Sequence, residues 1–91
     1  MIERIKSILE EVRGVPGLSQ NLSDSASLID DVGLDSLEML TFMLKIEERL
    51  RVRIDFEQMD FSYLQSIQAL SEFLGRMERL DPNEPATSLD L

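Results

Sequence analysis

The stretch from Gly33 to Glu38, which reads Gly-Leu-Asp-Ser-Leu-Glu, holds the residues best placed to take part in chemistry. Asp35 comes immediately before a long helical pattern and Glu38 follows three positions later, which is an aspartate version of the capping box. Ser36 is therefore expected in the first turn of a helix, and Gly33 permits a tight turn just before it. A phosphate ester on the Ser36 hydroxyl would lie at the positive end of the helix dipole, where anions are stabilised. The spacing thus predicts a serine hydroxyl that suits covalent modification.

The other side chains offer little chemistry of their own, so we expect no catalytic residue. The chain has no histidine, and no lysine lies close to Ser36 in sequence, so nothing is present to activate that hydroxyl as a hydrolytic nucleophile. It has no cysteine, which excludes disulfides and thiolate metal sites. Asp30, Asp31 and Asp35 crowd one end of a loop, but such clusters in acidic chains are usually solvated, and we predict no metal site. From these residues alone, the simpler interpretation of Ser36 is an unmodified first-turn serine.

Length and charge limit the classes of partner. At 91 residues the chain forms one small domain, which we place at residues 1–80, followed by a flexible tail at residues 81–91. It carries 18 acidic and 9 basic residues, a formal net charge of −9, which argues against a nucleic-acid partner and favours basic protein surfaces. No apolar run approaches the roughly 20 residues that cross a bilayer, and the first residues lack the apolar region of a signal peptide. We therefore expect a cytoplasmic protein with no membrane partner.

The elements that precede Ser36 should be a helix and a long loop. The apolar residues of the helix recur at helical spacing, at Ile2, Ile5, Leu9 and Val12. Lys6 falls among the charged residues of its exposed face, and the Gly-Val-Pro-Gly sequence that starts at residue 14 ends it. For residues 18–34 we expect a long loop, and since long loops without structure of their own are uncommon, we expect this one to be attached to the core. Five apolar residues should attach this loop to the core: Leu18, Leu22, Leu28, Ile29 and Val32.

A second helix is predicted from about Ser36 to about Leu50. One stripe of it is apolar and should face the core, with Met39, Phe42, Met43, Ile46 and Leu50. The opposite side carries Glu38, Thr41, Lys45 and Glu48, with Leu37 and Leu44 beside them. Two interpretations of this side remain open. It is either a solvated face with two exposed leucines, which is the more common case, or a docking strip next to Ser36.

The remainder of the chain predicts an extended segment and two further helices. Residues 51–56 alternate between polar and apolar types, but because no partner strand is evident we predict an extended connection with Val52, Ile54 and Phe56 pointing inward. A short helical segment should follow at about residues 56–61. The last helix is predicted at about residues 66–79, with Ser66 as its N-cap and Phe73 at the edge of the apolar stripe. The centre of that stripe consists of Ile67, Leu70, Leu74 and Met77.

The sequence around Ser36 resembles the acyl carrier proteins. The resemblance is carried by residues 26–38, Ala-Ser-Leu-Ile-Asp-Asp-Val-Gly-Leu-Asp-Ser-Leu-Glu, and centres on the motif Asp35-Ser36-Leu37. Gly33 before the motif and the acidic Glu38 after it also agree, and the predicted order of helices matches over about residues 2–79. The motif alone would be weak, but in a small, acidic, single-domain chain it is specific.

This resemblance implies an all-α fold, a four-helix bundle with a long first loop and a short third helix. It implies that a phosphopantetheinyl transferase esterifies 4′-phosphopantetheine from coenzyme A to Ser36, with Asp35 and Leu37 completing the attachment motif. The thiol of the arm would then carry acyl groups as thioesters, so the protein would be a carrier and not an enzyme. We also expect it to be a monomer. Tethering raises the effective concentration of the acyl group at each partner. The expected partners are acyl-loading enzymes and enzymes of the ketosynthase or acyltransferase type with basic docking patches.

The family's docking surface lies along the second helix. The positions of this chain that match it are Asp35, Leu37, Glu38, Leu44, Glu47 and Glu48. Thr41 and Lys45 depart from the acidic outer face of well-known fatty-acid carriers, and three arginines follow at residues 49, 51 and 53. Like charges at an interface discriminate against the wrong partner, so these departures favour a specialised pathway for a polyketide, a modified lipid or a related metabolite over housekeeping fatty-acid synthesis.

Three questions stay open at this level. The chain could be an aminoacyl or peptidyl carrier, although Gly33-Leu34-Asp35 favours the acyl type, or a helical binding module whose serine is never modified. An acyl chain could enter the core of a small bundle. The candidates to line such a cavity are Met39, Phe42, Met43, Ile54 and Ile67. An ordinary close-packed core is at least as good an interpretation of these five residues for the unloaded protein.

Overall fold

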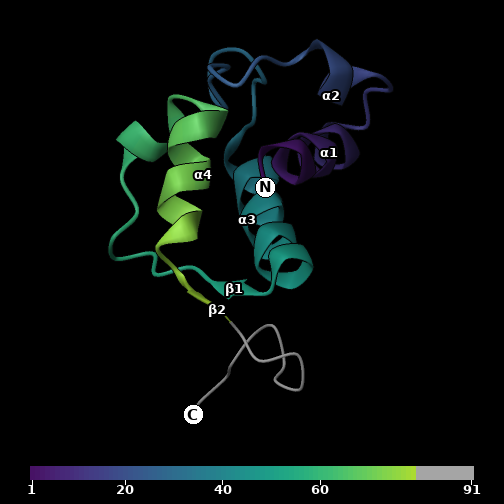
Figure 1. The fold of residues 1–91 in the computed structure, drawn as a ribbon. Coiled ribbons are helices and arrows are strands. Elements are labelled where there is room, and N and C mark those ends of the chain that lie inside the picture. Colours follow the sequence, from purple (N-terminus) through teal and green to yellow (C-terminus); the bar gives the residue numbers. More distant parts are fainter. Residues whose placement is uncertain (80–91) are drawn as a thin grey trace.

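A computed structural model describes residues 1–79, and the predicted tail at residues 81–91 lies outside the described residues. The elements in chain order are α1 (Ile2–Arg13), α2 (Leu18–Asn21), α3 (Ser36–Leu50), β1 (Val52–Arg53), the 3₁₀ helix η1 (Phe61–Leu64), α4 (Ile67–Gly75) and β2 (Glu78–Arg79). Figure 1 shows α3 and α4 as two upright helices above β1 and β2, with α1 packed against α3. The predicted all-α class is confirmed, since four α-helices carry the fold and the only sheet in residues 1–79 has two short strands. None of these helices has the length and apolar character needed to span a bilayer.

The first helix ends where the sequence predicts. Gly14 adopts a left-handed conformation with φ of 67°, and its N–H donates to the carbonyl of Glu10 over 2.8 Å. The placement of Lys6 on the exposed face is wrong, because Lys6 is buried and its Nζ donates to Asp24 Oδ1 over 2.8 Å. That hydrogen bond raises the pKa of Lys6. The contact ties α1 to the segment that leads to α3.

The segment between α1 and α3 is attached to the core, as predicted, but it is not free of secondary structure, because it contains α2. Leu28 and Val32 are buried, whereas Ile29 is 40% exposed, so its predicted place in the core is wrong. Three backbone hydrogen bonds hold this segment against the last part of the fold, one of them from the N–H of Gln68 to the carbonyl of Asp24 over 2.9 Å. The N–H of Leu28 donates to the carbonyl of Leu64 over 3.0 Å, and the N–H of Ile67 donates to the carbonyl of Ala26 over 3.0 Å.

The helix that starts at Ser36 has the predicted bounds, Ser36–Leu50. Four of its five predicted core residues are buried, namely Phe42, Met43, Ile46 and Leu50, and Met39 is partly buried against them. The core is completed by residues of all the other helices except α2, whose Leu18 packs against it only partly. The apolar stripe of α3 is therefore one part of a core that α1, η1, α4 and the segments between the helices share with it.

The alternating segment after α3 is a strand, and the prediction that it lacks a partner is wrong. β1 pairs with β2 in an antiparallel arrangement, with Val52 opposite Arg79 and Arg53 opposite Glu78. Val52 and Ile54 point into the core as predicted. Phe56 does not, because it lies in an exposed turn beyond the end of the strand.

The last two helices differ from prediction in their bounds. The short helix lies at Phe61–Leu64 rather than at about residues 56–61, and the Asp60 side chain accepts the N–H of Ser62 at its start. Ser66 caps α4 as predicted, with its Oγ accepting the N–H of Ala69 over 2.9 Å. α4 ends at Gly75, because the chain then turns into β2. Phe73 is buried rather than at the edge of the stripe.

Candidate functional site

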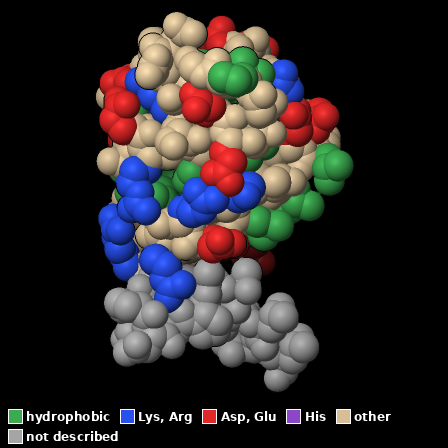
Figure 2. Space-filling model, turned by 90° about the vertical axis from the view of Figure 1, so that its right-hand side faces the viewer, with side chains coloured by type: hydrophobic (Ala, Val, Ile, Leu, Met, Phe, Trp, Pro, Cys, Tyr) green, Lys and Arg blue, Asp and Glu red, His purple; other side chains and the backbone are tan. Residues whose placement is uncertain are grey.

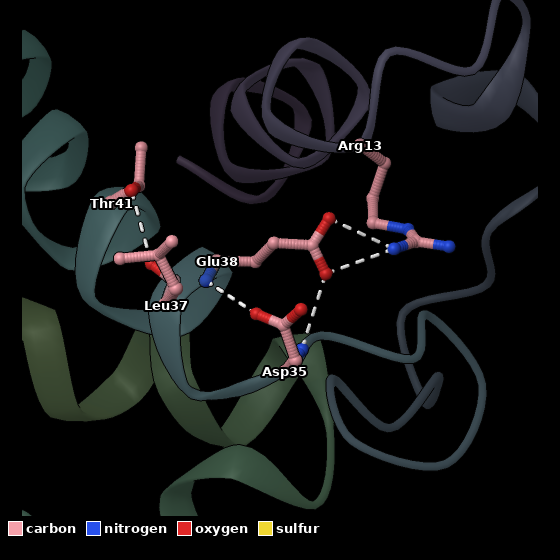
Figure 3. Close-up of polar contacts among 5 residues, drawn as sticks. All are labelled: Arg13, Asp35, Leu37, Glu38 and Thr41. Atoms are coloured by element: carbon pink, nitrogen blue, oxygen red, sulfur yellow. Dashed lines mark hydrogen bonds and ion pairs between the residues drawn. The ribbon is translucent and has the colours of Figure 1, made fainter.

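The capping box at the start of α3 is present in full (Figure 3). The N–H of Glu38 donates to Asp35 Oδ1 over 2.7 Å, and the N–H of Asp35 donates to Glu38 Oε1 over 3.2 Å. Ser36 is the first residue of the helix and is exposed. Within residues 1–79 its hydroxyl makes no hydrogen bond. The backbone at Ser36 is thus fixed while its hydroxyl remains accessible.

Arg13 joins this capping box from α1. Its Nη1 lies 2.9 Å from each carboxylate oxygen of Glu38, and both side chains are largely removed from solvent. Figure 3 shows Glu38 extending toward Arg13 while Leu37 points in another direction. Arg13 was not among the predicted site residues, because it lies 25 residues from Glu38 and no local pattern connects the two. Charge-assisted contacts of this kind are stronger than neutral ones, so the pair links the end of α1 to the first turn of α3.

The turn before the site also has a fixed backbone. Gly33 has φ of 78°, a left-handed conformation that residues with a side chain rarely adopt. The next residue, Leu34, is buried, and its N–H donates to the carbonyl of Leu28 over 3.2 Å. The chain therefore enters α3 from an anchored position. The expected role of Gly33 as a turn residue is confirmed.

A groove of about 580 Å³ opens beside Ser36. Its lining residues come from the long segment, from α3 and from η1, and are Ile29, Leu34, Asp35, Ser36, Met39, Phe61 and Leu64. Phe61 is 74% exposed, and neither it nor Ile29 was among the predicted site residues. They could have been recognised in the sequence as apolar residues that stand next to polar, turn-rich stretches. The groove is mostly apolar, and Ser36 is one of its lining residues.

The five predicted acyl-cavity residues do not form a cavity together. Only Met39 lines the groove beside Ser36. Phe42, Met43, Ile54 and Ile67 are buried in the core. These four residues agree with the other interpretation given above, an ordinary close-packed core. A bundle of this size needs its largest apolar side chains for packing.

The structure separates the six predicted docking residues into different environments. Asp35, Leu37, Leu44 and Glu48 are exposed. Glu38 is partly buried by its contact with Arg13. Glu47 is only 7% exposed, and its Oε2 accepts the N–H of Ile54 over 2.9 Å. Its prediction as a docking residue is therefore wrong, because this carboxylate serves to hold the chain where it leaves α3.

The basic residues that depart from the acidic outer face are paired within the molecule. Lys45 Nζ and Arg49 Nη2 contact Glu11 Oε1 over 3.2 and 2.7 Å. The hydrogen bond from Arg49, followed by that from Lys45, lowers the pKa of Glu11. Arg53 lies 3.8 Å from Glu78 across the small sheet. In Figure 2 most of the basic side chains lie in the lower half of this face, and an acidic side chain lies directly against those at its centre.

The described residues contain no group of three or more side chains that could hold a metal ion. Asp30, Asp31 and Asp35 do not converge on one point. Asp31 Oδ2 accepts the N–H of Ser27 over 2.7 Å, whereas Asp35 caps α3. The acidic residues before Ser36 thus shape the backbone of the loop.

Comparison with known proteins agrees with this geometry. The family described as "Phosphopantetheine attachment site" matches residues 3–74, which is most of the chain. The chain belongs to this phosphopantetheine attachment family. A relative named acyl carrier protein, from Saccharopolyspora erythraea, is 28% identical over 60 residues, which cover 66% of this chain and 61% of the relative. The match thus spans less than two thirds of the length of that carrier. Membership of the family means that the matched residues, 3–74, form a carrier domain rather than a catalytic one.

The prosthetic group of the family is 4′-phosphopantetheine, and the residues around Ser36 fit it. An exposed serine hydroxyl without a hydrogen bond is free to become a phosphate ester. The first-turn position places that ester by the N–H groups at the start of a 15-residue helix. The apolar groove lined in part by Ser36 offers room beside it. Nothing in the local geometry opposes attachment of the group.

Proposed function

We propose that this chain carries acyl groups as thioesters on a 4′-phosphopantetheine arm that a phosphopantetheinyl transferase attaches to Ser36. The observation that carries the proposal is the accessible, unbonded hydroxyl of Ser36 in the first turn of a capped helix, inside the part of the chain that matches the family. The arm supplies a reactive thiol to a chain that has no cysteine. The residues of the chain hold and present that arm.

Each residue near Ser36 has a defined part in this proposal. Asp35 and Glu38 fix the first turn of α3, so the Ser36 Oγ projects from a rigid backbone. Since Asp35 and Glu38 are held in the capping box and Glu38 also pairs with Arg13, we expect the transferase to remove the hydroxyl proton. Oγ then forms a bond to phosphorus, and the bond from that phosphorus to the adenosine bisphosphate part of coenzyme A breaks. The helix N-terminus stabilises the negative charge of the resulting phosphodiester.

We also propose a specialised pathway, for a polyketide, a modified lipid or a related metabolite, rather than housekeeping fatty-acid synthesis. The support is the reduced number of free carboxylates on α3, where Glu47 is buried and Glu38 is paired with Arg13. Partners that rely on strongly basic patches would find fewer matching charges on this helix. Acyl loading by fatty-acid synthase enzymes at the rate of a housekeeping carrier would contradict this part of the proposal.

The mass of the intact protein tests the attachment directly. The full chain is incubated with coenzyme A, magnesium and a broad-specificity transferase. We expect the wild type to gain the mass of one phosphopantetheine. Ser36→Ala should gain nothing, whereas Ser7→Ala, which removes an exposed serine of α1, should be modified like the wild type. An unmodified wild type would leave a helical binding module as the better interpretation, and modification of Ser36→Ala would overturn the site.

A further inference from the structure

A second groove lies at the end of the molecule opposite Ser36. It has a volume of about 400 Å³ and is lined by residues of β1, of β2 and of the turns beside them, at the lower end of the helices in Figure 1. The 15-residue α3 separates it from the modification site, because at 1.5 Å per residue the end of this helix lies about 20 Å from Ser36. The groove is therefore distinct from the phosphopantetheine site.

The floor of this second groove is apolar. Phe56 is 53% exposed there, and Met77 packs against the core beside it. Ile54 also lines the groove and is buried. An exposed phenylalanine in a concave surface offers apolar area that a bound segment would remove from water.

The rim of the groove is basic. Residues 51–53 and 76–79, which the pairing of β1 with β2 holds together, contain four arginines and one glutamate. Two of these arginines, Arg53 and Arg76, line the groove itself, and we name it the basic groove. The rest of residues 1–79 contains 14 acidic and 5 basic side chains. An acidic segment is therefore attracted to this end of the molecule and repelled by most of the remaining surface.

The two arginines of the rim are only weakly paired within residues 1–79. Arg53 lies 3.8 Å from Glu78, and the two side chains are 42% and 70% exposed, so this contact contributes little. Arg76 has no carboxylate partner among the described residues. Its guanidinium lies over the ring of Tyr63, 5.6 Å from the ring centre, which orients the group without neutralising its charge.

The other carboxylates near the basic groove are bound to the chain around it. The two oxygens of Asp55 accept the N–H of Glu57 and the side-chain amide of Gln58. The buried carboxylate of Glu47 accepts the N–H of Ile54. Glu57 is exposed on the same turn and is not a lining residue. The main competitor of a bound acidic segment is therefore Glu78.

Residues 80–91 follow directly after β2 and complement the basic groove in sequence. They hold three acidic residues, at positions 81, 84 and 90, no basic residue, and leucines at positions 80, 89 and 91. The sequence Asp-Pro-Asn-Glu at residues 81–84 is typical of a type I turn, with aspartate first and proline second. Such a turn predicts that the chain reverses direction after β2. The seven residues beyond the turn span up to about 23 Å when extended, which is enough to cross the groove.

We propose that residues 85–91 bind in the basic groove as an extended segment, with Leu89 and Leu91 on the apolar floor and Asp90 toward the basic rim. Successive side chains of an extended chain point to opposite sides, so the two leucines share one side and the carboxylate lies on the other. The long arginine side chains of the rim can reach that carboxylate. Because the segment is tethered to β2, its effective concentration at the groove is high and weak contacts suffice. The segment predicted to be a flexible tail is, in this proposal, part of the fold.

A spin label in the full chain tests where the segment lies. Because the chain has no cysteine, Ser88→Cys provides a single attachment point for a nitroxide label. In a nitrogen-15-labelled sample we expect the amide signals of residues 54–58 and 76–78 to broaden relative to the reduced label, and those of α2 to remain sharp. Equal broadening over all helices would show a segment without a fixed place and would overturn the proposal.

Two substitutions in the groove test the two kinds of contact, with broadening as the measure of the bound-to-free ratio. Phe56→Ser should lower that ratio about 5-fold, because part of a phenylalanine is no longer covered. Phe61→Ser, at an exposed phenylalanine outside the basic groove, is the matched control and should change nothing. Arg76→Gln should lower the ratio about 3-fold, as for a partly exposed ion pair, whereas Arg4→Gln on α1 should not. Unchanged broadening in both groove variants would overturn the proposal.

A substitution in the segment keeps the test valid if a groove variant fails to fold. Asp90→Asn removes the same charge interaction from the other side and should lower the bound-to-free ratio about 3-fold. Asp81→Asn changes the net charge equally but lies at the start of the predicted turn, and it should have little effect. Thermal unfolding of each variant confirms that it is folded. Equal effects of Asp90→Asn and Asp81→Asn would contradict the proposed placement.

A mixed sample separates binding within one chain from binding between chains. Spin-labelled protein at natural isotope abundance is added to nitrogen-15-labelled wild type. Broadening of residues 54–58 in this mixture would show that the basic groove binds the segment of a second copy, which overturns the proposal. The measurements do not depend on Ser36. A carrier that is modified at Ser36 but shows no localised broadening would keep the proposed function and lose only this inference.

Discussion

At its first turn α3 is held by polar contacts near the surface, whereas its last turns are held by buried contacts. Asp35, Glu38 and Arg13 fix the first turn, and Ser36 remains exposed among them. At the other end Leu50 is buried, and the Glu47 carboxylate accepts the Ile54 N–H away from solvent. The strand pairing of β1 with β2 follows directly after this end.

The difference shows how one helix combines rigidity with access. A segment that partner enzymes must reach cannot be stabilised by burying its own side chains, because burial would remove the hydroxyl from the surface. Hydrogen bonds to the backbone and an ion pair fix the same segment without covering Ser36. The hydrophobic contribution to stability therefore comes mainly from the middle and the far end of α3. Four sets of substitutions test this division, from the largest expected effect to the smallest.

The largest contrast should come from leucines at the two ends of α3. Leu50→Ala removes a buried side chain and should lower the free energy of unfolding by about 2–4 kcal/mol. Leu37→Ala removes a side chain that is mostly in water and should change it by less than about 0.5 kcal/mol. Urea unfolding followed by circular dichroism measures both. Equal losses of stability in the two variants would contradict the proposed difference between the two ends of α3.

The next contrast concerns two adjacent glutamates. Glu47→Ala leaves the buried N–H of Ile54 without its acceptor and should cost about 2 kcal/mol of stability. Glu48→Ala, at an exposed position, is the matched control and should have little effect. The same unfolding measurement applies. An unchanged stability of Glu47→Ala would show that the buried carboxylate is not needed where α3 leads into β1.

A smaller effect is expected at the capped end. Asp35→Ala removes the N-cap of α3 and should cost about 1 kcal/mol. Asp35→Asn keeps a capping oxygen and should retain most of that stability. Hydrogen exchange at the amide of Glu38 gives a local measurement, because this amide is the donor to Asp35. Unchanged exchange in Asp35→Ala would mean that the cap does not stabilise the first turn.

The smallest effect should be the pH dependence that Glu11 contributes. Its pKa is lowered in the folded protein by Arg49 and Lys45, so its ion pairs stabilise the fold above the ordinary glutamate pKa of about 4.3. This contribution is lost as the pH falls through the lower pKa of the folded state. Glu11→Gln should therefore be less stable than the wild type at neutral pH, with a difference that shrinks on acidification. A difference that is constant with pH would contradict the assigned ion pairs.

Local sequence patterns were sufficient to predict the capped end of α3. The Asp35–Glu38 spacing, the bounds of α3 and the end of α1 at Gly14 all depend on contacts within a few residues, and the structure confirms each. The resemblance carried by Asp35-Ser36-Leu37 led to the family, which comparison with known proteins confirms. The attachment at Ser36 itself stays a prediction.

The errors concern contacts between residues far apart in sequence. β1 finds its partner 25 residues later at Glu78, and no turn signal links the two strands. Glu47 lies among exposed charges on α3, yet its partner is a backbone N–H beyond the helix end. Arg13 reaches Glu38 from another helix. Phe56 continues the alternating pattern beyond the end of the strand. The pattern alone therefore predicted, wrongly, that its side chain is buried.

The two backbone hydrogen bonds of Ala26 and Leu28 with the η1–α4 region have a mechanical consequence for the groove. They join the segment that carries Ile29 and Leu34 to the one that carries Leu64, so these two walls form a single frame. The frame is stiff in the direction of those bonds. A wider groove would therefore require rotation of exposed side chains, such as that of Phe61, rather than separation of the backbone segments.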